Sequence, residues 1–266
     1  MKLAILALAT LAACATAPKM AESKGTLLGR LTWIEAEKVL TPETVVVIPL
    51  GAESKEHGPH LLLENDFLLA QYFERRVRER CDVVVAPTIN YSFYPAFLEY
   101  PGSTSLKLDT ARDVVIDVVA SLARYGPKRF YVLNTGVSTV RALEPARAAL
   151  AAQGIEMRYS TWDRLEPLYA DVVEEKGGTH ADEVETSMLL YIDPSAVDMS
   201  KAVDDYHPSE KGGLTRDPDK PGTYSASGVF GFATLATRAK GEVIVERVVA
   251  QLVKEIEELR AARVNG

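Results

Sequence analysis

The chain has 266 residues, 47% of them hydrophobic, which is enough to bury a sizeable core and favours a single domain. Its formal net charge of −7 argues against nucleic acid or an anionic membrane surface as a partner. We find no internal repeat and no second domain. These bulk properties indicate an acidic globular protein.

The first residues are typical of a secretory signal. Lys2 precedes a short apolar run, residues 3–13, which ends in Leu-Ala-Ala-Cys with Cys14 last. The run is too short to span a bilayer as a helix. Its ending resembles the bacterial lipoprotein signal, in which the cysteine becomes the lipidated N-terminus; an ordinary cleaved signal is the alternative. Lipidation of Cys14 would leave Cys81 as the only thiol, without a disulfide partner.

We therefore predict a signal peptide over residues 1–14, a flexible tether over 15–26 and one folded domain over 27–266. The protein is expected to be exported and held in the bacterial cell envelope, facing the periplasm. Its contact with the membrane would then be the lipid anchor alone.

The N-terminal half of the domain begins with a short helix over 31–37, where Thr32 and Glu35 form a capping box. A β-branched run then predicts a strand over 45–50 that is buried on both faces. A helix follows from Asn65 and Asp66, then a strand over 83–86. Residues 89–100 form an aromatic-rich loop, which suits equally the wall of a substrate pocket and a core-packed crossover.

The C-terminal half continues the alternation of strands and helices. We predict a helix over 109–124, a strand over 129–134, a helix over 143–153 with Pro145 in its first turn, and a strand over 155–159. Thr179 is expected to cap the next helix, with Asp182 at the capping-box position. A polar loop over 201–227 carries a solvated His207, and a last helix covers 240–263. This pattern predicts an α/β fold with a mainly parallel central sheet between two helical layers, a three-layer α/β/α arrangement.

The loop after the first buried strand carries several side chains that can bind a metal ion. It carries two histidines among carboxylates, just past the carboxyl end of a core strand, where open α/β sheets bind ligands. Imidazole and carboxylate together are a ligand set for zinc or manganese. The residues are Glu53, Glu56, His57, His60 and Asp66.

Four segments resemble the creatininase (creatinine amidohydrolase) family. Residues 56–66 are similar to its Glu-Gln-His-Gly-Pro-His-Leu-Pro-Leu-x-x-Asp pattern, which is quite specific. Residues 91–106, 180–187 and 227–241 look like its Tyr-Gly-x-Ser-Pro…Pro-Gly-Thr-x-Ser-Leu, His-Ala-Gly-x-x-Glu-Thr-Ser and Gly-Val-x-Gly…Ala-Thr-x-x-Lys-Gly segments. The resemblance runs from about residue 31 to the C-terminus.

The resemblance implies a metal-dependent amidohydrolase that cleaves a C–N bond in a small, often cyclic, amide with a metal-activated water. It implies one or two zinc or manganese ions per chain, and a homo-oligomer, since the family commonly forms hexamers. His180 would transfer a proton to the leaving nitrogen. The implied metal ligands are Glu56, His57, Asp66 and Glu185, with Glu185 also assisting catalysis; the implied substrate pocket includes His60, Tyr91 and Tyr94.

The sequence also departs from the family pattern. Lys55 stands where the family has a glutamate two residues before the histidine, so Glu56 is the substitute ligand and Glu53 the reserve. Gly136 replaces a metal histidine, and Tyr94 replaces a serine. Either the second metal is held differently, with His180, Asp182 and Glu183 at hand, or the site is mononuclear or inactive. Creatinine itself is not the expected substrate.

Two other functions are compatible with the residues. Gly136 to Val140 follows a core strand and opens a helix, as a serine-hydrolase nucleophile elbow with Ser138 would, although Val140 stands in place of the last glycine. The chain would also serve as a lipid-anchored binding protein on an inactive hydrolase scaffold. Bound metal distinguishes both from the amidohydrolase.

Overall fold

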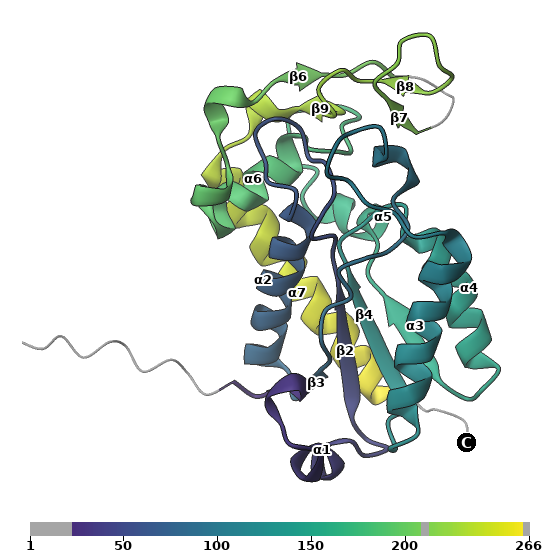
Figure 1. Ribbon diagram of the computed structural model, residues 1–266. Coiled ribbons are helices and arrows are strands. Elements are labelled where there is room, and N and C mark those ends of the chain that lie inside the picture. The colour runs from purple at the N-terminus through teal and green to yellow at the C-terminus, as the bar shows by residue number, and fades with distance from the viewer. Residues whose placement is uncertain (1–22, 209–212, 263–266) are drawn as a thin grey trace, which may run out of the picture.

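The computed structural model describes residues 23–208 and 213–262 (Figure 1). The predicted signal peptide, Cys14 and residues 15–22 of the predicted tether lie outside the described residues. Gly25 and Thr26, which we assigned to the tether, belong to the fold: the Gly25 amide donates to the Arg78 carbonyl, and Thr26 pairs with Val84. The domain thus begins slightly earlier than predicted.

A parallel sheet lies at the centre, in the strand order β1-β3-β2-β4-β5. The central pair, β2 (Val45–Leu50) and β4 (Arg129–Asn134), is paired along its whole length, from Val45 opposite Arg129 to Leu50 opposite Asn134. Every residue of β2 is buried, as its β-branched run predicts. The outer strands are β1 (Thr26–Leu27), β3 (Val84–Val85) and β5 (Glu156–Tyr159).

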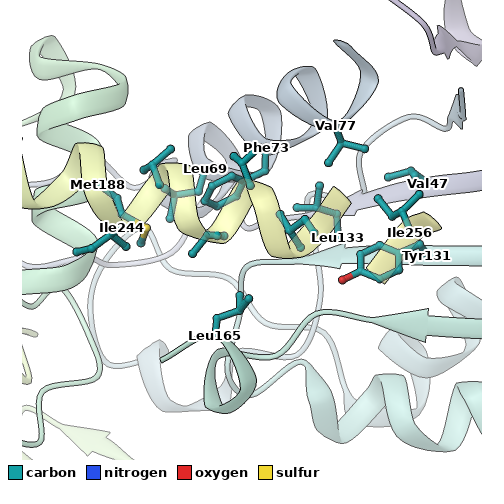
Figure 2. Close-up of a cluster of buried hydrophobic side chains, with 14 of the residues drawn as sticks. Val47, Leu69, Phe73, Val77, Tyr131, Leu133, Leu165, Met188, Ile244 and Ile256 are labelled. Carbon is teal, nitrogen blue, oxygen red and sulfur yellow. The ribbon is translucent and has the colours of Figure 1, made fainter. Parts of the chain in front are cut away.

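Helices cover both faces of the sheet, which confirms the predicted three-layer α/β/α fold (Figure 1). On one face, α2 (Asn65–Arg80), α6 (Glu183–Ile192) and α7 (Arg238–Ala261) enclose a core with alternate strand residues such as Val47 and Leu133 (Figure 2). On the other, α3 (Leu108–Ala123) and α4 (Val140–Ala151) pack on Val46 and Val132. The alternation of side chains along each strand divides the core in this way.

Short elements complete the chain. Helix α1 (Trp33–Val39) has the predicted capping box between Thr32 and Glu35. A 3-10 turn, Pro95–Phe97, lies in the aromatic-rich loop, and α5 (Trp162–Leu165) follows β5. The long loop before α7 forms two small strand pairs at the end of the molecule where α6 begins: β6 (Asp204–Asp205) with β9 (Gly231–Phe232), and β7 (Leu214–Thr215) with β8 (Thr223–Tyr224) (Figure 1).

Several helix bounds differ from the prediction by one or two residues, and two helix starts differ in their local structure. Helix α4 begins at Val140, so Pro145 lies inside the helix and not in its first turn. Asp182, not Thr179, caps α6, because its side chain accepts a hydrogen bond from the Glu185 amide. In the part of the chain that the structure describes, no helix is long and apolar enough to cross a membrane.

Candidate active site

The predicted site residues come together at the carboxyl end of β2. His57 and Glu56 lie in the loop after β2, and Asp66 lies in the first turn of α2. Gly51 permits this approach, since a Cβ atom there would lie 2.3 Å from the Asp66 carbonyl oxygen. His180 lies three residues before the start of α6 and is held by backbone hydrogen bonds with Phe230, one of them 2.9 Å long.

His57 is fully buried and bonded through both ring nitrogens. Nδ1 lies 2.9 Å from the Lys55 carbonyl oxygen, and Nε2 lies 3.0 Å from Asp66 Oδ1. A carbonyl only accepts, so Nδ1 donates to it; Nε2 faces the Asp66 carboxylate as a donor and would release its proton to bind a metal through its lone pair. The Lys55 carbonyl thus fixes the tautomer that a metal ligand requires.

Asp66 is fully buried between two partners. Its Oδ1 faces His57, and its Oδ2 lies 2.7 Å from the Lys55 ammonium nitrogen. Burial disfavours the charged carboxylate, but the Lys55 ammonium and His57 more than compensate, so the pKa of Asp66 lies well below its usual range. Asp66 is therefore an anion, and both of its oxygens are engaged.

His180 lies between two carboxylates. Its Nε2 is 3.2 Å from Glu56 Oε2, and its Nδ1 is 3.6 Å from Glu185 Oε2. Burial raises the pKa of Glu56, yet His180 and a hydrogen bond from the Gly58 amide outweigh this and lower it. Gly228, at φ 86°, is needed here because a Cβ atom would collide with the Glu56 carboxylate.

The start of α6 holds Glu185 in place. Ala181 has φ 48°, a left-handed conformation that is rare for a residue with a side chain, and its amide donates to Glu185 Oε2 at 2.6 Å. Strain of this kind is typical of functional sites. Next to it, burial and the neighbouring Glu175 and Glu185 carboxylates raise the pKa of Asp182 well above its usual value.

The donor set suits one divalent ion. His57, His180 and Glu185 each offer a ligand atom within 4.8 Å of one another. His57 Nε2 and Asp66 Oδ1 are 3.0 Å apart, and two ligands at about 2.0–2.2 Å from one metal lie at such a separation. On the other side of the carboxylate, the Lys55 ammonium nitrogen lies 2.7 Å from Oδ2.

Other predicted residues lie beside or outside this cluster. His60 is buried and bonds Thr186 Oγ1 through Nε2 at 2.8 Å, and burial lowers its pKa to about 4. Tyr94 is buried next to Lys55, whereas Tyr91 is 48% exposed. The reserve ligand Glu53 is exposed and accepts a hydrogen bond from Asn90.

The remaining candidates have partners elsewhere. Glu183 accepts hydrogen bonds from the Glu174 and Glu175 amides and pairs with Lys240, so it is not free to bind a metal. Ser138 donates to the Phe93 carbonyl at 2.8 Å, and no hydrogen bond joins it to a histidine among the described residues. His207 has a side chain 65% exposed and pairs with Asp205, as expected of a solvated residue.

A cavity of about 380 Å³ adjoins Glu185. Trp162 and Tyr169 contribute aromatic walls, and Met188 and Val173 contribute apolar ones. Its lining includes five carboxyl side chains and, among the described residues, no lysine, arginine or histidine. The carboxyl side chains belong to Asp163, Glu166, Glu175, Asp182 and Glu185.

Sequence reasoning missed the role of Lys55. The residue was visible as a departure from the family pattern, but nothing near it in the sequence shows that its ammonium lies against Asp66. The cavity was also missed, since Trp162, Tyr169 and Met188 come from separate elements. A lysine among acidic metal-ligand candidates is the one signal that points to a fixed cation.

Comparisons with known proteins agree with this architecture. A family model described as creatinine amidohydrolase matches residues 29–256. A creatinine amidohydrolase from Pseudomonas putida is 30% identical over 256 residues, which cover 89% of this chain and 98% of that protein. A mycofactocin precursor peptide peptidase from Mycobacterium ulcerans is 26% identical and covers 86% of this chain and 91% of its own length. A solved structure described as a manganese creatininase superposes with a TM-score of 0.76 at 26% identity, covering 90% of this chain and all of that one.

Proposed function

Because the chain belongs to the creatininase family, we propose that it is a hydrolase that cleaves a C–N bond in a small amide with the help of one zinc or manganese ion. The observation that carries the proposal is the buried cluster of His57, Asp66, His180 and Glu185, which two segments of the chain, 57–66 and 180–185, bring together. Relatives described as a creatinine amidohydrolase and a peptide peptidase, and a manganese form of creatininase, support the same reaction class.

The ion would be held by His57 Nε2 and Glu185, whose ligand atoms converge, with Asp66 Oδ1 as a further oxygen beside His57. When bound, it supplies a Lewis acid that polarises the amide carbonyl and lowers the pKa of water. The protein contributes the orientation: the Lys55 carbonyl fixes the His57 tautomer, and the Ala181 amide holds the Glu185 carboxylate.

His180 would carry the proton to the leaving nitrogen. Glu56 Oε2 lies 3.2 Å from its Nε2, so the carboxylate both orients the ring and stabilises its protonated form. Glu185 flanks the other nitrogen, with its Oε2 3.6 Å from Nδ1, so His180 lies between two carboxylates. Loss of such a group typically lowers the rate about 10²- to 10⁴-fold.

The cavity beside Glu185 would receive the substrate. Five carboxyl groups and no basic side chain in its lining favour a neutral or cationic amide over an anionic one. Trp162 and Tyr169 suit a flat ring or a cationic group packed on an aromatic face.

Metal analysis of purified protein, together with hydrolysis assays on a panel of cyclic and linear amides, tests the proposal. The wild type should carry about one equivalent of metal, and His57→Asn should lose it together with activity. His180→Asn should keep the metal but lose activity, and Glu53→Gln, a change at an exposed carboxylate of the same loop, should behave like the wild type. If the wild type carries no more metal than His57→Asn, the metallohydrolase proposal is wrong.

Export and anchoring through Cys14 are a separate proposal, supported by Lys2, the apolar run and the Leu-Ala-Ala-Cys ending. In cells that express the full chain, the protein should incorporate labelled palmitate. The labelled protein should then be found in the membrane fraction. Cys14→Ser should abolish labelling. Equal labelling of both proteins would contradict the proposal.

A further inference from the structure

Lys55 is a buried cation in the centre of the candidate site. The residue is 4% exposed, and its ammonium nitrogen lies 2.7 Å from Asp66 Oδ2. The same nitrogen lies 4.7 Å from the centre of the Phe97 ring and 5.6 Å from that of Tyr94. Aromatic faces and a carboxylate both attract an ammonium ion. Lys55 is therefore a fixed part of the site.

The Asp66 carboxylate would need both oxygens to bridge two ions. Here one oxygen faces His57 Nε2, where an ion fits, and the other faces Lys55. A divalent ion on Oδ2 would have to share a water-poor space with an ammonium group, and two cations repel strongly there. The lysine thus excludes an ion from this side.

Tyr94, which lies beside Lys55, also borders Gly136, where there is little room for a side chain. A Cβ atom on Gly136 would lie 2.9 Å from Thr139 Cγ2, 3.0 Å from Thr139 Oγ1 and 3.3 Å from the Tyr94 ring. Tyr94 is only 1% exposed and Thr139 is fully buried. A histidine at position 136, as in the family pattern, has no room unless these side chains move. At both positions that depart from that pattern, Lys55 and Gly136, other packed side chains therefore occupy the space.

The charges of the two arrangements agree. A glutamate with one negative charge and an ion with two positive charges leave one net positive charge beside Asp66. A lysine ammonium supplies that same single positive charge. The neutral histidine is replaced by neutral groups. The electrostatic field at Asp66 is thus maintained without the ion.

We propose that the Lys55 ammonium replaces the second metal ion, so that the site holds one divalent ion on the His57 side of Asp66 and a permanent lysine cation on the other. The inference deepens the proposed function, on which it rests for the first ion. Lys55 acts as a positioning residue: it holds Asp66 charged and oriented toward His57, and its own charge faces the same space.

Metal stoichiometry tests the inference. The full-length protein is stripped with a chelator and titrated with Zn²⁺ or Mn²⁺ alone by calorimetry, and its metal content is checked by elemental analysis. We expect one equivalent for the wild type and two for Lys55→Glu, which removes the ammonium and restores a carboxylate. Thermal unfolding gives a readout independent of activity: saturating metal should raise the melting temperature of Lys55→Glu more than that of the wild type.

Two further variants keep the test decisive. Lys55→Gln removes the charge without adding one, and it should take up a second ion at least tenfold more weakly than Lys55→Glu; it also replaces that variant if Lys55→Glu fails to fold. Lys107→Glu reverses the charge of an exposed lysine and should bind one equivalent, like the wild type.

The outcomes separate this inference from the proposed function. If the wild type binds two equivalents of metal, Lys55 does not exclude the second ion. The same holds if the wild type and both Lys55 variants each bind one equivalent. Either result overturns the role of Lys55 but is compatible with a metallohydrolase. No ion in the wild type but uptake by Lys55→Glu or Lys55→Gln supports the exclusion by Lys55 and overturns the one-ion hydrolase. No ion in any variant overturns both.

Discussion

The two sides of the Asp66 carboxylate differ in how far their residues depart from the family pattern. On the side of Oδ1, His57, His180 and Glu185 match the family pattern, and their nitrogen and oxygen atoms face one another across a space that suits an ion. On the side of Oδ2, Lys55, Tyr94 and Thr139 fill the space with an ammonium group and packed side chains. The first side remains a polar site, and the second has become an ion pair embedded in the core.

The same carboxylate thus has donor atoms that suit an ion on one side and an ammonium group on the other. Asp66 is as deeply buried as β2, and a buried carboxylate needs a cation close by. Lys55 meets that need from two residues before His57, in the same loop. The predictions below test the two sides separately, beginning with the largest effect.

Removal of the shared carboxylate should be the most damaging change. Asp66→Ala leaves the Lys55 ammonium buried without a counter-charge, and breaking a buried pair in this way costs about 3–5 kcal/mol of unfolding free energy. Urea unfolding of the metal-free protein measures it. The double variant Lys55→Met with Asp66→Leu removes both charges and should recover most of the loss. Equal destabilisation of the single and double variants would contradict a paired core.

Restoring the family histidine at position 136 should not create a metal ligand, because packed side chains occupy the space. Gly136→His places a side chain against Thr139 and Tyr94, and overpacking of this kind costs about 1–3 kcal/mol. The variant should melt at a lower temperature and gain no metal. Addition of Thr139→Ala, which removes the nearest atoms, should restore part of the stability. A stable Gly136→His protein that binds an additional ion would show that the space is not filled.

Acid pH should destabilise the folded state through protonation of the buried His60 ring. Burial lowers its pKa to about 4, below the ordinary 6.5, so the folded state favours the neutral ring. Between these values the unfolded chain binds a proton that the folded chain does not, so the stability present above pH 6.5 is lost as the pH falls toward 4. The expected loss between pH 7.5 and pH 4.5 is about 2–3 kcal/mol, since one pKa unit corresponds to about 1.4 kcal/mol.

Urea unfolding of the wild type and of His60→Gln between pH 7.5 and pH 4.5 isolates this contribution, because other groups titrate in both proteins. The wild type should lose more stability than the variant over that range. Parallel pH profiles would exclude His60 as the source.

The smallest effect is expected at Ala181. Its φ of 48° strains a residue with a side chain, so Ala181→Gly should stabilise the protein by about 0.5 kcal/mol, once the greater flexibility of the unfolded glycine is subtracted. The matched change Ala148→Gly, at an exposed position inside α4, should destabilise by about 0.5–1 kcal/mol. Equal destabilisation by both would mean that the left-handed conformation at 181 carries no strain.

The fold could be predicted largely from local patterns. The β-branched run of β2, the Thr32–Glu35 capping box and the alternation of strands with helices each act over a few residues, and the structure has them where the sequence indicates. Helix starts were less predictable: Asp182 competes with Thr179 for the α6 cap, and only the backbone geometry before α6 decides between them.

The sequence by itself indicated where a candidate site lies, because His57 and Asp66 are nine positions apart and follow a core strand. Only the tertiary structure decided their partners. His180 is 124 residues from Glu56 in the chain, and the Gly136 space is filled by Tyr94 from another loop. Lys55 is close to Asp66 in sequence, but its ammonium turns inward only because burial of the carboxylate demands a counter-charge. The inward orientation of Lys55 depends on the closed core around both groups, and no local stretch of sequence specifies that core.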